Sequence, residues 1–218
     1  MIAAIAVAGL IGGLLVAEVV ARLPDPAPLG RAGRVAIAVL NAGGWAFAGN
    51  HWHLWWQVVP FALLASALVC VSAIDLRTYR IPNKVVFPAL GVSVVLLFVA
   101  TTRLEPAVGT WAYYRGALVG AALYFGFLLI PHLIYPKGMG MGDVKLALLM
   151  GLYLGWGHGT LDVFAVVTSA LFVGCVFGIV SGFIINGFRK RRRAFPFGPA
   201  LAAGCFLIVV QATGAPIT

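Results

Sequence analysis

The sequence predicts an all-α protein, a polytopic bundle of about eight transmembrane helices with both termini outside. Three observations predict this class. Hydrophobic residues fill 62% of the 218 positions and charged residues only 10%, and the mean hydropathy is +1.02. A soluble globular domain carries roughly 25% charged residues, so this chain has too few to cover its apolar surface in water. We therefore expect lipid to be its solvent, with spans of roughly 20 residues.

Eight apolar segments follow one another along the chain, separated by short polar stretches. The first has no Lys or Arg before Arg22, and it exceeds the roughly 7–15 apolar residues of a signal peptide, so we expect it to remain as a span. Gly and Ala are frequent within the segments, which permits close helix packing in lipid. The second and sixth segments are the shortest. The segments lie at approximately 2–20, 34–49, 54–74, 85–101, 115–135, 144–157, 160–186 and 197–213.

Basic residues are distributed unevenly between the loops, and this predicts the orientation of the spans. Of the fifteen Lys and Arg residues, only Arg103 and Arg115 lie outside four alternate stretches, at 22–34, 77–84, 137–145 and 189–193. By the positive-inside rule these four stretches face the cytoplasm. We expect residues 1–218 to form a single integral-membrane domain. In it, 1–53 hold the first two spans and a short cytoplasmic loop, and 54–218 hold the core spans.

The net charge of +9 is explained by this topology. Nucleic-acid binding is not expected, because the basic residues lie in short loops without interleaved aromatic residues. The run at 189–193 is typical of an anchor facing anionic headgroups. The three cysteines lie far apart inside apolar segments and form no C-x-x-C pair, so no zinc site is expected. His51 and His53 flank Trp52 in a stretch typical of an interfacial aromatic belt, and no metal site is expected there.

Two of the six acidic residues, Asp75 and Asp143, stand at the cytoplasmic boundaries of the third and sixth predicted spans. The topology places them on the same side of the membrane and at similar depth. An ionisable residue at such a position is a functional candidate. The alternative is that each carboxylate forms an ion pair with a nearby base. Asp75 would then pair with Arg77 or Arg80, and Asp143 with Lys145.

The residues before Asp143 read GMGMGD, with Gly138, Gly140 and Gly142 at alternate positions. Glycine lets one backbone approach another closely and takes φ values that other residues avoid. Irregular backbone at membrane depth is tolerated only where it is buried in protein or lines a water-filled cavity. The motif therefore predicts a wet cleft that contains a carboxylate.

After Asp75, the residues Ile81, Pro82 and Asn83 predict a turn that leads into the fourth span. Proline fixes φ at the point where the chain leaves one helix and begins the next.

Two carboxylates within roughly 3–6 Å cannot both ionise cheaply, so one pKa rises and the pair shares a proton. The ionised member can take a proton from water, and the protonated member can donate to a peptide carbonyl, as in aspartic proteases. This chemistry needs no metal and no cofactor. A proton- or cation-coupled transporter is the alternative, because membrane carboxylates beside a glycine-broken helix also suit ion coupling. A catalytically silent assembly protein would have no use for both acids.

Three segments follow one another in the order of a known protease family. They read IDLRTYRIPN at 74–83, KGMGMGDVKL at 137–146 and FPFGPALAAG at 195–204. They resemble the prepilin peptidases, or type IV leader peptidases, which are aspartic membrane proteases of the GxGD type. The run at 9–24 is similar to the first span of that family. The resemblance implies Asp75 and Asp143 as the catalytic pair. It implies that the motifs around them are shaped by Gly138, Gly140, Gly142, Lys145, Pro82 and Asn83.

The resemblance also implies a substrate and a location. The reaction would be cleavage of the short basic leader of a type IV prepilin, Flp pilin or pseudopilin precursor at the cytoplasmic boundary of the bacterial inner membrane. Membrane lipid would be the other partner. Many family members carry a cytoplasmic domain with paired C-x-x-C motifs after the first span and N-methylate the product. Here the stretch at 23–34 holds no cysteine. We therefore expect a short form with peptidase activity, no N-methyltransferase activity and no S-adenosylmethionine.

Overall fold

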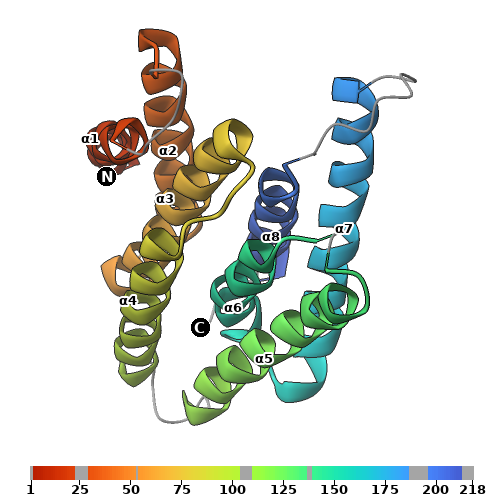
Figure 1. The fold of residues 1–218 in the computed structure, drawn as a ribbon. Coiled ribbons are helices and arrows are strands. Elements are labelled where there is room, and N and C mark those ends of the chain that lie inside the picture. The colour runs from red at the N-terminus through yellow and green to blue at the C-terminus, as the bar shows by residue number, and fades with distance from the viewer. Residues whose placement is uncertain are drawn as a thin grey trace.

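The computed structural model describes residues 2–22, 29–52, 54–103, 110–136, 139–186 and 196–212. Within these residues every regular element is an α-helix (Figure 1). Each helix lies on one of the eight apolar segments expected from the sequence, so the prediction of an all-α bundle is confirmed. The helices are α1 (Ile2–Ala21), α2 (Arg31–His51), α3 (Trp55–Thr78), α4 (Asn83–Thr102), α5 (Thr110–Ile134), α6 (Met141–Gly155), α7 (Thr160–Asn186) and α8 (Gly198–Ala212).

Five of the helices are long and apolar enough to cross a membrane, so the chain is a multi-pass membrane protein. They are α1, α3, α4 and most of α5 and α7 (Trp111–Ile134 and Asp162–Ile184). The helices α6 and α8 have 15 residues each. A helix of that length rises only about 22 Å, which is less than the roughly 30 Å hydrocarbon core of a bilayer.

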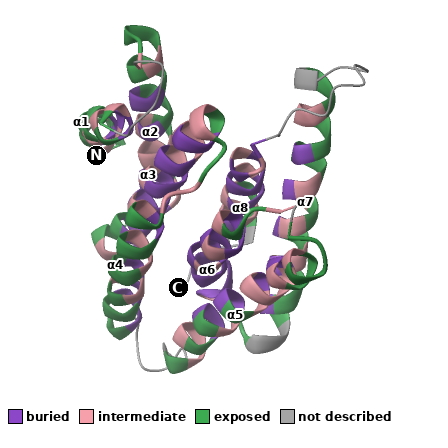
Figure 2. Ribbon diagram, in the orientation of Figure 1, coloured by how far each residue is buried: buried purple, intermediate pink, exposed green. Residues whose placement is uncertain are grey.

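The short helix α6 lies at the centre of the bundle (Figure 1), where it does not need to match the bilayer. The chain forms two halves in this view, α1–α4 on one side and α5–α8 on the other. Figure 2 shows α6 buried along almost its whole length, while α1, α4 and α7 expose their outer faces. All residues from Leu149 to Trp156 are buried. Protein therefore surrounds this helix, and its neighbours face the lipid.

The helices α5 and α6 approach each other through glycines. Gly116 and Gly120 of α5 face Gly155 and Gly151 of α6. A Cβ atom added at any of the four would run into backbone atoms of the facing helix. Small residues at such spacing let two helices pack backbone to backbone in lipid. The sequence showed the glycines of α5 but gave no reason to single them out, because small residues are frequent throughout the chain.

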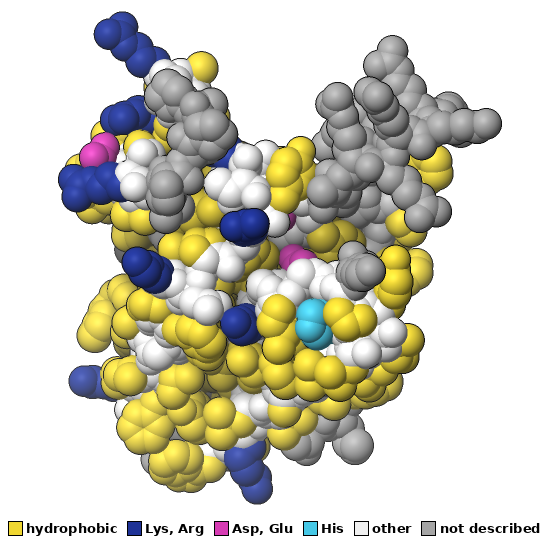
Figure 3. Space-filling model, viewed as in Figure 1, with side chains coloured by type: hydrophobic (Ala, Val, Ile, Leu, Met, Phe, Trp, Pro, Cys, Tyr) yellow, Lys and Arg dark blue, Asp and Glu magenta, His cyan; other side chains and the backbone are white. Residues whose placement is uncertain are grey.

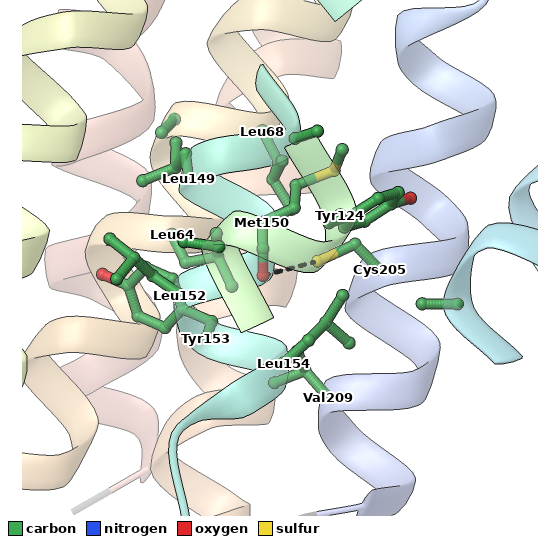
Figure 4. Packing of buried hydrophobic residues seen from close by; sticks show 14 of the residues in the cluster. Leu64, Leu68, Tyr124, Leu149, Met150, Leu152, Tyr153, Leu154, Cys205 and Val209 are labelled. Carbon is green, nitrogen blue, oxygen red and sulfur yellow. Dashed lines mark hydrogen bonds between the residues drawn. The ribbon is translucent and has the colours of Figure 1, made fainter. Parts of the chain in front are cut away.

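Large apolar side chains fill the space around α6 (Figure 4). Met150 and Leu149 of α6 belong to one buried cluster with Leu68 of α3 and Tyr124 of α5. The thiol of Cys205, from α8, lies 4.0 Å from the backbone oxygen of Met150. Cys70 and Cys205 are buried and Cys175 is half-buried.

Aromatic side chains pack the end of α6 that lies away from Asp143. The rings of Trp52 and Phe61 stack with centroids 3.7 Å apart, and Phe61 also contacts Tyr153 and Trp156 edge to face. Trp52 was expected in an interfacial belt, but it is buried inside the protein. Trp55 is exposed on the surface instead. His53 lies outside the described residues.

Candidate active site

Asp75 lies in the last turn of α3, and its side chain is buried with 5% of the residue exposed. The helix ends because Tyr79 takes the left-handed conformation, with φ 53° and ψ 31°. The Tyr79 N–H donates to the Asp75 carbonyl oxygen at 2.9 Å, and the Thr78 hydroxyl donates to the Ile74 carbonyl oxygen at 3.0 Å. These bonds satisfy carbonyl groups that a helix end leaves without partners. They fix the backbone beside the carboxylate.

The turn expected after Asp75 is present. Pro82 adopts an extended conformation, with φ −77° and ψ 132°, and stands immediately before α4. Asn83 is the first residue of that helix. Proline suits the start of a helix because the N–H it lacks would have no partner there. The chain thus leaves α3, passes Ile81 and enters α4 within a few residues.

Asp143 lies in the first turn of α6 and is buried with 9% exposed. Gly140 precedes the helix with φ −71°, and Gly142 is inside its first turn. The expectation that these glycines take φ values closed to other residues is wrong, because the only described glycine with positive φ is Gly157. They serve close approach instead. A Cβ at Gly140 would lie 3.2 Å from a carboxylate oxygen of Asp143. Gly138 lies outside the described residues.

Ile81 brings the segments of the site together. A Cβ added at Gly142 would lie 2.7 Å from the Cβ of Ile81, and a Cβ at Gly198 would lie 3.4 Å from the Cδ1 of Ile81. The start of α6 and the start of α8 therefore both pack against the turn that follows α3. The three sequence segments that carry the family resemblance meet at this one side chain.

The backbone N–H of Gly198, the first residue of α8, donates to a carboxylate oxygen of Asp75 at 3.0 Å. The space beside this bond is filled, because a Cβ at Gly198 would lie 2.9 Å from that oxygen. An N–H group at a helix start favours a negative charge. Sequence reasoning missed Gly198 as a site residue. The sequence feature that could have indicated Gly198 is its position in the segment 195–204, which is one of the three segments that carry the family resemblance.

The two carboxylates interact with each other. Burial, together with the negative charge of the nearby Asp75, raises the pKa of Asp143 from 3.8 to about 6. The backbone N–H groups of Gly140 and Asp143 partly oppose this rise. Asp143 precedes the apolar part of α6 and lies outside the five helices that are long enough to span. Figure 3 shows acidic side chains in the middle of this face, with Lys and Arg side chains nearby. The raised pKa of Asp143 favours a pair in which one carboxyl group is protonated and the other is ionised, as the sequence predicts.

Among the described residues, Asp143 does not form the ion pair with Lys145 that the sequence left open as an alternative. Ion pairs in this part of the chain join Glu18 to Arg22 and Arg34. The Lys145 ammonium donates to the side-chain oxygen of Asn83 at 3.1 Å and lies 5.7 Å from the centre of the Phe87 ring. Lys145 thus connects the start of α6 to the start of α4.

A histidine supports the backbone ahead of α6. The Nδ1 atom of His132, near the end of α5, lies 2.9 Å from the carbonyl oxygen of Met139. A carbonyl only accepts, so this bond requires a proton on Nδ1. His132 therefore has a structural hydrogen bond. Among the described residues, no group of three or more His, Cys, Asp or Glu side chains is placed to hold a metal ion.

Comparison with known proteins identifies the family. The family model described as "Type IV leader peptidase family" matches residues 62–187, which include both aspartates. The chain belongs to the type IV leader peptidase family. Within this family, the peptidase interpretation is favoured over the transporter that the sequence had left open. No solved structure gives a significant match to the chain.

Several curated relatives carry the same name, "Prepilin leader peptidase/N-methyltransferase". One from Bacillus subtilis is 30% identical over 172 residues, covering 79% of this chain and 63% of the relative. One from Burkholderia pseudomallei is 34% identical over 148 residues, covering 65% and 42%. One from Aeromonas salmonicida is 34% identical over 149 residues, covering 67% and 47%. The chain thus spans between two fifths and two thirds of the length of these relatives.

Proposed function

We propose that the chain is a membrane aspartic endopeptidase that removes the leader of prepilin-like precursors, with Asp75 and Asp143 as its catalytic pair. The observation that carries this proposal is that two buried carboxylates, from the last turn of α3 and the first turn of α6, are near enough for the charge of Asp75 to raise the pKa of Asp143. Membership of the leader peptidase family supports the reaction class. The names of the curated relatives support the class of substrate.

We propose different tasks for the two acids. The N–H of Gly198 donates to Asp75, which stabilises its ionised form, so Asp75 takes a proton from the attacking water. Asp143, whose pKa is raised to about 6 by burial and by the charge of Asp75, is the acid of the pair: in its protonated form it donates a proton to the carbonyl oxygen of the scissile bond. The tetrahedral intermediate then collapses. The proton held by Asp75 passes to the leaving amine, and Asp143 regains its proton from the intermediate, so that both acids return to their starting state.

The substrate would reach this pair from the cytoplasm. The stretches at 22–34 and 77–84 are rich in Arg and Lys, which supports a cytoplasmic position for this end of the bundle by the positive-inside rule. A short basic leader remains on that side, and the apolar helix behind it enters the lipid. The scissile bond between them then lies at the boundary where Asp75 and Asp143 stand. We assign the protein to the bacterial inner membrane on this basis.

We also propose that the chain lacks N-methyltransferase activity and uses no S-adenosylmethionine. The stretch between α1 and α2 contains no cysteine. The family members that methylate their product carry paired C-x-x-C motifs in a domain at that position.

A cleavage assay tests the proposed reaction. Purified full-length protein in detergent is mixed with pilin-like precursors from the same genome, and the new N-terminus is read by mass spectrometry. We expect Asp75→Asn and Asp143→Asn each to lower the rate by about a thousandfold or more, the scale seen when a catalytic group is removed. The matched control is Asp162→Asn, which removes an exposed carboxylate of α7 and should leave the cleavage rate unchanged.

Two outcomes would contradict the proposal. Full activity of either aspartate variant would exclude the shared-proton pair. Absence of cleavage by the wild type across type IV, Flp and pseudopilin precursors would exclude the activity. In a second assay, S-adenosylmethionine is added and the mass of the new N-terminus is measured. A methylated N-terminus would contradict the proposed absence of N-methyltransferase activity.

A further inference from the structure

An apolar groove of about 430 Å³ runs between α2, α3 and α8. Its walls extend from Ala36 to Gly44 on α2, from Ala65 to Leu76 on α3 and from Pro199 to Phe206 on α8. Most of the lining side chains are small or aliphatic, and Ser72 is the only polar one among the described residues that line it. A polar ligand would find almost no hydrogen-bond partners in this groove.

One end of the groove opens beside the candidate active site. Leu76 follows Asp75 on α3, and Pro199 follows Gly198, whose N–H donates to Asp75. At the other end α2 and α8 come together, because the rings of Phe47 and Phe206 meet edge to face with centroids 5.7 Å apart. The groove therefore extends from the residues that follow Asp75 and Gly198 in sequence to an aromatic contact.

The length of the groove suits a helix. Its wall on α3 covers eleven residue steps from Ala65 to Leu76, which corresponds to about 16 Å of helix axis. Ala36, Gly44 and Ala203 leave space for the side chains of a neighbouring helix, since small residues allow close helix contact in lipid. About three turns of an apolar helix would fit along this wall.

We propose that the groove binds the apolar helix of the substrate precursor, over about the first three turns that follow the scissile bond. This inference rests on the proposed peptidase function. In a prepilin-like precursor the leader is followed directly by an apolar helix. When the scissile bond lies between Asp75 and Asp143, that helix must leave the active site along the protein surface. The groove starts beside Asp75, has the required apolar lining and runs along α3 into the membrane.

Filling the groove tests the proposal kinetically. Ala36 is exposed and lines the groove, so Ala36→Trp places an indole in the path of the substrate helix. We expect kcat/KM for the full-length precursor to fall about tenfold through a higher KM, with kcat unchanged, as when ground-state binding is lost. Ala122→Trp, at an exposed position on α5 away from the groove, is the matched control and leaves both constants unchanged. Thermal stability in detergent is measured for both variants.

Cross-linking provides a test that does not depend on turnover. Ala203→Cys places a thiol in the groove of the uncleaving Asp143→Asn protein, with the half-buried Cys175 replaced by Ser. Single cysteines are scanned along the precursor helix. We expect disulfides only at the few precursor positions that face Ala203, three or four residues apart, because a disulfide needs Cα atoms within about 7 Å of each other. Ala122→Cys on α5 is the control and forms none.

The outcomes separate this proposal from the proposed function. If the wild type cleaves no precursor, the peptidase function fails. If the wild type cleaves, but Ala36→Trp is unaffected and no helix position cross-links to the groove, the function stands and the groove proposal is overturned. A groove that reacts with a photoactivatable phospholipid, but not with the precursor helix, holds lipid, and this result also overturns the proposal.

Discussion

The two ends of α6 are built from different kinds of contact. The end near Trp156 is aromatic, and the side-chain polar atoms of Tyr153 and Trp156 are hydrogen-bonded. The Tyr153 hydroxyl lies 2.9 Å from both the Pro60 carbonyl oxygen and the Ser93 hydroxyl, and the Trp156 indole donates to Thr101 at 2.9 Å. The opposite end starts with the buried Asp143 carboxylate, whose ionised form is disfavoured by burial and by Asp75.

This difference shows how the bundle can hold an unfavourable charge. The aromatic end ties α6 to α3 and α4 through Tyr153 and to α4 through Trp156. The glycine contacts tie it to α5 along its length. These contacts hold α6 in place and do not involve Asp143. The protein can therefore keep a buried carboxylate at this end for catalysis, although the charge destabilises the fold. Changes at the aromatic end should alter stability, and changes at the charged end should alter catalysis.

The largest expected effect is that Asp143→Asn makes the folded protein more stable than the wild type at high pH but not at low pH. The pKa of Asp143 is about 6 in the folded protein, compared with an ordinary value of 3.8. Folding therefore favours the protonated form, and stability falls as pH rises from about 4 to 6. Asp143→Asn removes this loss, which amounts to at most roughly 3 kcal/mol of unfolding free energy. We expect a higher thermal unfolding temperature than the wild type at pH 8, and no difference at pH 4.

The measurement is a thermal unfolding series in one detergent over this pH range. Asp162→Asn, at an exposed position of α7, controls for the loss of one negative charge. Equal shifts at pH 8 and pH 4 would contradict the account of Asp143.

The second effect concerns the contact that joins the two motifs. Gly142→Ala places a Cβ 2.7 Å from the Cβ of Ile81, so the start of α6 must move away from the turn after α3. Two carbon atoms in ordinary contact lie about 3.5–4.0 Å apart, so the start of α6 must move by about 1 Å. A misplacement of about 1 Å can lower the rate of an enzyme by about a hundredfold. We expect kcat to fall by that factor with little change in unfolding temperature.

Gly126→Ala is the matched control for that change, because a Cβ at Gly126 has no neighbour within 4 Å. The double variant Gly142→Ala with Ile81→Gly, which removes the Cβ of Ile81, should recover part of the lost rate. Unchanged kcat in Gly142→Ala would show that the contact does not position the carboxylates.

The third effect tests the aromatic end. Tyr153→Phe leaves the Pro60 carbonyl and the Ser93 hydroxyl without this partner inside the protein. An unsatisfied buried polar group costs about 1–3 kcal/mol. We expect a lower unfolding temperature and an unchanged kcat below it. Tyr135→Phe, at an exposed tyrosine just after α5, should change neither, and a loss of kcat in Tyr153→Phe would remove the distinction between the two ends.

The smallest effect concerns Lys145 and Asn83, which are bonded at 3.1 Å. A double-mutant cycle with Lys145→Met and Asn83→Ala measures their coupling. We expect about a fivefold interaction in kcat/KM, which is the scale of a partly exposed contact pair. Lys84→Met, at an exposed position beside Asn83, replaces Lys145→Met in the control cycle. Fully additive effects of Lys145 and Asn83 would show that the bond has no role in catalysis.

The positions of the helices could be predicted because hydropathy depends on local composition alone. The partners of each helix could not. Gly116 and Gly120 pair with Gly155 and Gly151, but small residues recur so often in this chain that their spacing carries little information. Packing partners are chosen in three dimensions, by which small faces meet.

The candidate site shows the same limit. Asp75 and Asp143 stood out because charged side chains are rare at membrane depth and the topology placed both on one side. The Gly198 N–H could not be found from composition, since every residue except proline has such a donor. The role of Gly142 was predicted only in part, because close approach was expected but its partner was not. Its value lies in contact with Ile81, which is distant in sequence, and not in an unusual backbone angle.

Ile81 has a consequence for the acid strength of the pair. Asp143 is carried by the α5–α6 hairpin, and Asp75 by α3, whose following turn carries Ile81. The hairpin packs against Ile81 at Gly142, and α8 packs against the same side chain at Gly198. We therefore expect the size of this aliphatic side chain to influence the separation of the two carboxyl groups. Through that separation, an uncharged residue would alter how strongly the charge of Asp75 raises the pKa of Asp143.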